Sequence, residues 1–290
     1  MVKLSLRQST SVCWAKSRKA LTPRGRYRGW RVAAALLLLV AAPVLLALQR
    51  YGRGFLLRDP IVTYAPPPDQ DGSEFYFTRL VYDGGMGRWG WRGGWATDYP
   101  KSEYHFMKGV QRLTNIDAAG EGKLIRPLED EIFEYPWLYA VEVGRWYLTQ
   151  EEADHIREYL LRGGFLMVDD FHGTYQWAGF LESMQRVFPE RPILEIEEDA
   201  PILHVLYSLD QRIQIPGRQV IRSGRTYERD GIVPHWRGIY DDEGRLMVAI
   251  NFNMDLGDAW EHADWPEYPE PMTALAYRFG INYIVYAMTH

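Results

Sequence analysis

The chain has 290 residues, of which 47% are hydrophobic, 24% are charged and 14% are aromatic. These values exclude a disordered protein, a collagen-like protein and a small disulfide-rich protein. The net charge of −5 conceals two opposite parts. Residues 1–58 hold twelve basic residues and no acidic one, whereas residues 59–290 carry a net charge of −17, which opposes nucleic-acid binding.

An uncharged apolar run covers residues 32–48, and with Gln49 it would span about 27 Å as a helix. This length is just enough to cross the hydrocarbon core of a bilayer. Aromatic rings flank the run at the positions where they favour lipid headgroups. The residues that mark the predicted anchor are Trp30, Val32, Leu36, Pro43, Leu48 and Tyr51.

A cleaved signal peptide is the alternative to a retained anchor, because both begin with basic residues followed by an apolar run. The run is longer than the usual apolar core of a signal peptide, and no small-x-small cleavage pattern follows it. Nine basic residues precede the run and three follow it closely, a bias that places the N-terminus in the cytoplasm. We therefore expect a single-pass protein of the bacterial inner membrane with a periplasmic domain.

The predicted organisation is a basic cytoplasmic tail at 1–31, a transmembrane helix at 32–49, a Pro-rich linker at 50–73 and a periplasmic domain at 74–290. The tail has few core-forming residues, so we expect that it does not fold alone. The one cysteine, Cys13, lies in the tail. The exported domain therefore has no thiol for a disulfide, for metal binding or for nucleophilic catalysis.

Strand and helix patterns alternate along the domain, which predicts an α/β fold with a mainly parallel sheet. The alternation starts with an aromatic and β-branched strand and ends with a long apolar helix. In the first half of the domain, the expected elements are a strand at 75–82, a Gly- and Trp-rich loop at 83–100, a helix at 102–113 and a strand at 138–143. The next helix begins with a capping box between Thr149 and Glu152 and stops at Gly163. The remaining elements are a strand at 165–168, a helix at 174–188, strands at 193–196, 236–240 and 246–252, and a helix at 272–288.

Several stretches of the domain resemble a known family. The segments YPWLY at 135–139, LTQEE at 148–152 and YLLRGGFLMVDD at 159–170, together with those at 95–100 and 282–287, resemble motifs of the bacterial domain-of-unknown-function family numbered four-one-five-nine. The similarity covers residues 74–289. This family is similar to the class I glutamine-amidotransferase-like superfamily, and the resemblance implies a flavodoxin-like three-layer sandwich.

The same resemblance bears on activity. Where an active amidotransferase has its cysteine, at a tight turn after a strand, this chain has Asp169-Asp170-Phe171-His172-Gly173. Without a thiolate the usual route of glutamine hydrolysis has no nucleophile. We therefore expect no glutamine amidotransferase activity.

Asp169, Asp170 and His172 form the first candidate site, because ligands of open α/β sheets bind at the carboxyl ends of the strands. Two carboxylates and an imidazole could bind a divalent cation or act as acid and base. The alternative, which we favour, is that an aspartate at a strand end caps the following helix or turn. We accordingly predict no catalytic residue, no metal and no cofactor.

The loop at 83–100 is the second candidate site, because its glycines allow unusual backbone angles and its aromatic rings offer large flat faces. The rings could stack on sugars or contact a protein, or the loop could fold over its own domain as a lid. The candidate ligand- or partner-binding residues of this region are Trp89, Trp91, Trp95, Asp98 and Tyr99.

A third region, at 251–262, is acidic and contains one histidine. It lacks the ligand pattern and the closing glutamate of an EF-hand loop. Calcium bound in another geometry is one interpretation of this stretch. The favoured one is a surface loop with side-chain turns.

The predicted function is that of a non-enzymatic membrane subunit, because the chain combines an anchor and an aromatic loop with the lack of a nucleophilic cysteine. Its partners would be the lipid bilayer and a larger integral-membrane complex, photosynthetic or respiratory for example, which it stabilises or scaffolds. The alternative is a periplasmic carbohydrate- or envelope-binding protein or hydrolase that uses the Asp169, Asp170 and His172 cluster. That alternative requires the aromatic loop and the cluster to lie on one side of the sheet.

Overall fold

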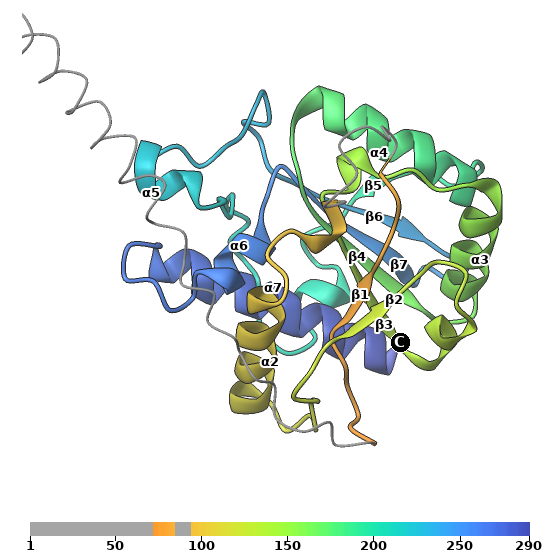
Figure 1. Ribbon diagram of the computed structural model, residues 1–290, viewed down its shortest axis with the longest axis horizontal. Coiled ribbons are helices and arrows are strands. Elements are labelled where there is room, and N and C mark those ends of the chain that lie inside the picture. The colour runs from red at the N-terminus through yellow and green to blue at the C-terminus, as the bar shows by residue number, and fades with distance from the viewer. Residues whose placement is uncertain (1–71, 85–93) are drawn as a thin grey trace, which may run out of the picture. The chain divides into compact units, whose positions relative to one another are not determined.

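The computed structural model describes residues 72–84 and 94–290 (Figure 1). They form a mixed α/β fold on a seven-stranded sheet with the strand order β2-β1-β3-β4-β7-β6-β5. Strands β2, β1, β3, β4 and β7 run parallel, and β6 is antiparallel to both β7 and β5. The predicted α/β class with a mainly parallel sheet is confirmed. The strands are β1 (Thr78–Leu80), β2 (Lys123–Ile125), β3 (Trp137–Val141), β4 (Phe165–Phe171), β5 (Leu194–Glu195), β6 (His235–Tyr240) and β7 (Leu246–Phe252).

Helices lie on both faces of the sheet (Figure 1). One face is covered by α2 (Lys101–Leu113), α6 (Leu256–Glu261) and α7 (Glu270–Thr289), and the other by α3 (Gln150–Leu161) and α4 (Gly173–Val187). The remaining elements are α5 (Gln219–Ser223) and the 3-10 helices η1 (Gly94–Ala96), η2 (Asp130–Glu134), η3 (Val143–Arg145) and η4 (Pro201–Leu203).

Alternation along β3 explains how one strand contributes to two cores. Successive side chains of a strand point to opposite faces of the sheet. Trp137 and Tyr139 therefore pack with α2, α6 and α7, whereas Leu138 and Ala140 pack with α3 and α4. All four side chains are fully buried, as expected for a central parallel strand covered on both faces.

Local signals read from the sequence place α3 correctly. The Thr149 hydroxyl accepts the N–H of Glu152, and the Glu152 carboxylate accepts the N–H of Thr149 at 2.8 Å, so the predicted capping box is confirmed. The helix ends at Leu161, and Gly163 adopts a φ of +110°, which glycine tolerates better than other residues. Strand β4 begins directly afterwards at Phe165.

Strand β4 is longer than predicted, because it continues through the two aspartates to Phe171. The pairing of β4 with β7 is regular up to Val168 and shifts before Phe171. Asp170, within the shifted stretch, has a φ of +51°. Asp169 and Asp170 are therefore part of a buried, irregular strand end rather than of a loop.

Among residues 72–84 and 94–290, no helix is both long and apolar enough to cross a membrane. The predicted tail, the predicted span at 32–49 and most of the linker lie outside the described residues. The same is true of the anchor residues Trp30, Val32, Leu36, Pro43, Leu48 and Tyr51. The anchor therefore stays a prediction.

Candidate ligand site at the carboxyl edge of the sheet

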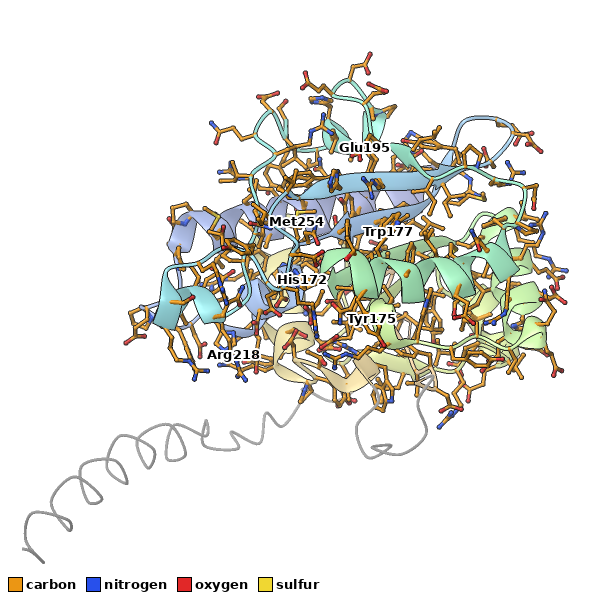
Figure 2. All side chains as sticks on the ribbon, turned by 90° about the horizontal axis from the view of Figure 1, so that it is seen from above. His172, Tyr175, Trp177, Glu195, Arg218 and Met254 are labelled. Atoms are coloured by element: carbon orange, nitrogen blue, oxygen red, sulfur yellow. The ribbon has the colours of Figure 1, made fainter. Side chains whose placement is uncertain are left out.

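Carboxyl groups from distant parts of the chain meet where β4 and β7 end. Asp170 lies in the irregular last part of β4, Asp255 follows β7, and Asp98 precedes α2. One carboxylate oxygen of each residue lies within 4.8 Å of the others. The backbone supports this convergence, since the N–H of Asp170 donates to the carbonyl of Met254 at 3.2 Å. Figure 2 marks the region with the labels His172 and Met254.

Asp169 caps a helix, as the favoured sequence interpretation predicts. The capped helix is α6, whereas the helix that follows Asp169 in the chain is α4. Its Oδ2 accepts the N–H groups of Leu256 at 2.8 Å and Gly257 at 3.0 Å, in the first turn of α6. The Tyr139 hydroxyl donates to the same oxygen at 3.2 Å. At the start of α4, the N–H of Gly173 instead donates to Oδ1 of Asn253 at 2.9 Å.

Asp170 and His172 form a buried pair. Nε2 of His172 lies 3.1 Å from Oδ1 of Asp170, and His172 is 2% exposed and Asp170 8% exposed. Burial lowers the pKa of His172 and favours its neutral form. Burial, reinforced by repulsion from Asp258, raises the pKa of Asp170 to about 8.

The neighbouring carboxyl groups share this electrostatic environment. Burial raises the pKa of Asp169 and that of Glu142 to about 7 each, and repulsion from Asp170 is the second cause in both cases. Burial also raises the pKa of Asp98 and of Asp255 well above the usual range, and nearby carboxylates add to both effects. Buried like charges that raise one another's pKa are a common feature of functional sites.

The backbone at this edge is unusual as well. Four of the five described non-glycine residues with positive φ lie here, namely Asp98, Glu142, Asp170 and Asn253, with φ between 51° and 63°. Such residues cost on the order of 1 kcal/mol each and gather at functional sites. Their concentration at one sheet edge indicates that the position of these side chains matters.

Arg79 fixes the segment that carries Asp98. It is fully buried in β1, forms an ion pair with Glu103, and donates to the carbonyls of Trp95 at 2.8 Å and Thr97 at 3.0 Å. These bonds fasten residues 95–103 to the sheet. Sequence reasoning missed Arg79, although a single arginine in an otherwise apolar aromatic strand is a recognisable signal.

With this geometry established, comparison with known families gives one result. The model of the family described as Domain of unknown function (DUF4159) matches residues 76–288. The chain belongs to this family. The predicted family resemblance is therefore confirmed over almost all of the domain, while the further similarity to amidotransferases stays a prediction. A search of curated proteins finds no match.

The structure brings part of the second candidate site to the same edge of the DUF4159 domain. Asp98 lies in the carboxylate group, and Trp95 is half-buried against the core on the α3 and α4 face. The Tyr99 ring is 42% exposed, and its centroid lies 6.3 Å from that of Trp95. Trp89 and Trp91 lie outside the described residues.

The prediction of a surface loop at 251–262 is wrong. Residues 256–261 form α6, and Asp255, Trp260 and His262 are buried. The Asp255 carboxylate accepts the N–H of Asp258 at 2.7 Å, which caps the helix, and Asp258 lies 3.3 Å from Nδ1 of His262. An Asp three residues before another polar residue is an N-cap signal that would have identified this short helix.

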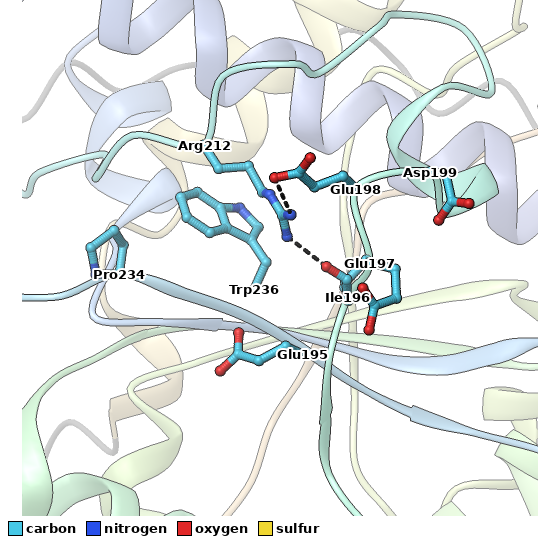
Figure 3. Close-up of a pocket in the computed structure, with 8 residues that line it drawn as sticks. All are labelled: Glu195, Ile196, Glu197, Glu198, Asp199, Arg212, Pro234 and Trp236. Carbon is cyan, nitrogen blue, oxygen red and sulfur yellow. Dashed lines mark hydrogen bonds and ion pairs between the residues drawn. The ribbon is translucent and has the colours of Figure 1, made fainter.

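A pocket of about 580 Å³ opens elsewhere on the DUF4159 domain, beside β5 and β6 (Figure 3). Trp236 lines it, and Arg212 donates to the carbonyl of Ile196 at 2.5 Å. Its acidic residues are solvated side chains at a sheet edge, and none of the predicted site residues lines it. The pocket is therefore separate from the carboxyl-edge site.

Proposed function

We propose that the protein is a non-enzymatic, single-pass membrane subunit whose periplasmic DUF4159 domain stabilises a larger integral-membrane complex. The predicted transmembrane helix at 32–49 and the basic tail at 1–31 support an anchored protein with a cytoplasmic N-terminus. The observation that carries the proposal is a group of exposed apolar side chains on the folded domain. We name Tyr175, Ile232 and Val233 the apolar patch.

The apolar patch is exposed to an extent that is unusual for such large side chains. Tyr175 is 76% exposed, Ile232 62% and Val233 59%. The two segments that carry these residues are joined by Asn253, which accepts the N–H of Gly173 at 2.9 Å and donates to the carbonyl of Val233 at 2.6 Å. Large apolar side chains exposed on two neighbouring segments favour contact with another protein.

Purification in a mild detergent, with a tag after His290, tests the proposal. We expect the wild-type chain to bring down a stoichiometric membrane complex. The triple variant Tyr175→Ser, Ile232→Ser, Val233→Ser should lose the complex, with a change of unfolding free energy of at most about 1 kcal/mol because the replaced side chains are exposed.

Leu113→Ser is the matched control, since Leu113 is 53% exposed on α2 and lies outside the patch. This variant should retain the complex. Recovery of the wild-type chain as a lone monomer in several mild detergents would contradict the proposal.

A second candidate function is an envelope- or carbohydrate-binding protein or hydrolase that uses Asp169, Asp170 and His172. It is supported by the position of Asp98, which belongs to the aromatic loop at 83–100 and lies with Asp170 at one sheet edge. In a sedimentation assay with purified peptidoglycan, the wild-type chain should bind and Asp170→Asn should bind at least about tenfold more weakly. Equal binding of the two proteins would remove this candidate.

We also infer that the DUF4159 domain is a flavodoxin-like sandwich. The five parallel strands follow the order β2-β1-β3-β4-β7, which corresponds to the order 2-1-3-4-5 of flavodoxin-like sheets. In that fold ligands bind at the carboxyl edge near the point where the strand order reverses, between β1 and β3. The carboxylate group lies at the same carboxyl edge, where β4 and β7 end.

A further inference from the structure

The arrangement of oxygen atoms at the carboxyl edge is suited to a cation. Asp98, Asp170 and Asp255 are separated by more than seventy residues in sequence, yet each contributes one carboxylate oxygen to a group within 4.8 Å. Asp170 and Asp255 are 8% and 3% exposed. Solvent screens the repulsion between carboxylates on a protein surface. Buried carboxylates are not screened in this way, so they need a counter-charge or protons.

Two unpaired carboxylate oxygens lie at the same edge of the sheet. Oδ2 of Asp98 and Oδ1 of Asp169 are buried and receive no hydrogen bond from any described residue. Asp169 is fully buried, and its other oxygen already accepts the N–H groups of Leu256 and Gly257. A buried carboxylate oxygen without a donor is destabilising unless something outside the protein satisfies it.

Gly257 lies beside the carboxyl groups of Asp98 and Asp255. A Cβ atom at this position would lie 2.5 Å from Oδ2 of Asp98 and 3.6 Å from Oδ1 of Asp255. The N–H of Gly257 donates to Asp169, so the carboxyl group of Asp169 borders the same point. The lack of a side chain at residue 257 leaves the acidic groups free to approach one another there.

The buried arginine that acts on Asp98 is already engaged by other partners. Arg79, the buried arginine nearest in sequence to Asp98, is bonded to Glu103 and to three further acceptors. The guanidinium of Arg79 is thus hydrogen-bonded to groups other than the three aspartates.

We propose that Asp98, Asp170 and Asp255 bind one Ca²⁺ ion, with Asp169 at the border of the site. Carboxylates are hard oxygen ligands and select hard cations. Ca²⁺ binds oxygen at about 2.3–2.6 Å, so two ligands on opposite sides of the ion are roughly 4.6–5.2 Å apart. The three oxygens, each within 4.8 Å of the others, are close enough to ligate one such ion. A site made of three carboxylates suits Ca²⁺ better than Mg²⁺, which usually keeps several waters and binds only one or two carboxylates.

The test uses the full-length protein in detergent after treatment with a chelator. Addition of Ca²⁺ at about 100 times its dissociation constant should raise the Tm by about 5–10 °C, because an ion that binds only the folded state stabilises it. Mg²⁺ at the same concentration should have a smaller effect. Tb³⁺, which occupies Ca²⁺ sites, should show luminescence on excitation of the aromatic residues, and Ca²⁺ should displace it.

Asp255→Asn and Asp98→Asn should each abolish the Ca²⁺-dependent shift in Tm and the Tb³⁺ signal. Their metal-free Tm should equal or exceed that of the wild type, since each replaces a repelled carboxyl group by a neutral isostere. This readout separates loss of the site from loss of the fold. Glu243→Gln, an exposed change in the turn before β7, is the matched control and should respond as the wild type does.

The proposal is overturned if the wild-type protein shows neither a Tm shift nor Tb³⁺ binding at millimolar concentration. It is also overturned if Asp98→Asn, at the most accessible of the three positions, retains the full response. The first result would indicate that protons rather than a cation neutralise the group, and the second that Ca²⁺ binds elsewhere on the protein. The subunit proposal would be unaffected, because it depends on the apolar patch.

Discussion

Arg79→Met is expected to lower the free energy of unfolding by about 3–5 kcal/mol, because it leaves the Glu103 carboxylate buried without a counter-charge. The side chains of Arg79 and Glu103 are 0% and 4% exposed. The substitution also leaves the carbonyls of Trp95 and Thr97 without their donors. Urea unfolding of the full-length chain, followed by tryptophan fluorescence, measures the loss.

Two further variants isolate the cause. Arg79→Met combined with Glu103→Leu should be less destabilised than Arg79→Met alone, because no unpaired charge then remains in the interior. Arg162→Met removes an exposed ion pair with Glu158 and should cost at most about 1 kcal/mol. A loss below about 1 kcal/mol for Arg79→Met would show that the buried pair does not stabilise this fold.

The same network links stability to the proposed ion site. Arg79 holds the segment from Trp95 to Glu103, and Asp98 lies within that segment. If the segment is released, one of the three proposed Ca²⁺ ligands loses its fixed position. Arg79→Met should therefore also reduce the Tm shift produced by Ca²⁺, a result that a purely local destabilisation would not give.

Trp260→Ala is expected to destabilise the protein by about 3–5 kcal/mol through loss of packing and formation of a cavity. Trp260 is fully buried on α6, and its ring lies 4.3 Å from that of Phe106 and 5.8 Å from that of Tyr139, centroid to centroid. It thus fastens α6 both to α2 and to the sheet. The measurement is again the free energy of unfolding in urea.

Tyr175→Ala serves as the control for Trp260→Ala, because it removes an aromatic ring that is 76% exposed. Its cost should remain within about 0.5 kcal/mol. A similar loss for the two variants would mean that the contact of α6 with the sheet contributes little. A loss for Trp260→Ala near the upper value would identify α6 as the helix that holds Asp255 and Asp258 in place.

Elements with strong local signals were predictable from the sequence. The capping box at Thr149 and the glycine after α3 act through neighbouring backbone groups, and both are found as expected. Strand β2 was missed because it has only three residues, Lys123–Ile125, and is defined by its pairing with β1. Such a short segment has no periodicity of its own and forms through tertiary contacts.

The candidate site was predictable in part. Asp169, Asp170 and His172 follow from the rule that ligands bind where parallel strands end, and all three lie at this edge. Asp98 was a candidate as part of the aromatic loop, and it lies at the same edge. Asp255 was not assigned, because its stretch resembles a polar loop in sequence. Only the sheet order, with β7 beside β4, reveals that it lies next to Asp170.

The antiparallel pairing of β6 and β7 gives experimenters a convenient place for a reporter group. Since β7 is parallel to β4, the turn at 241–245 lies at the amino edge of the sheet, opposite to the carboxylates. The seven residues of β7 separate the turn from the site by roughly 20 Å at about 3.3 Å per residue. Glu243 in this turn is exposed to solvent. A fluorophore attached at Glu243 can report ion titration and complex assembly at the opposite edge by energy transfer. It would not touch the carboxyl groups of the proposed ion site.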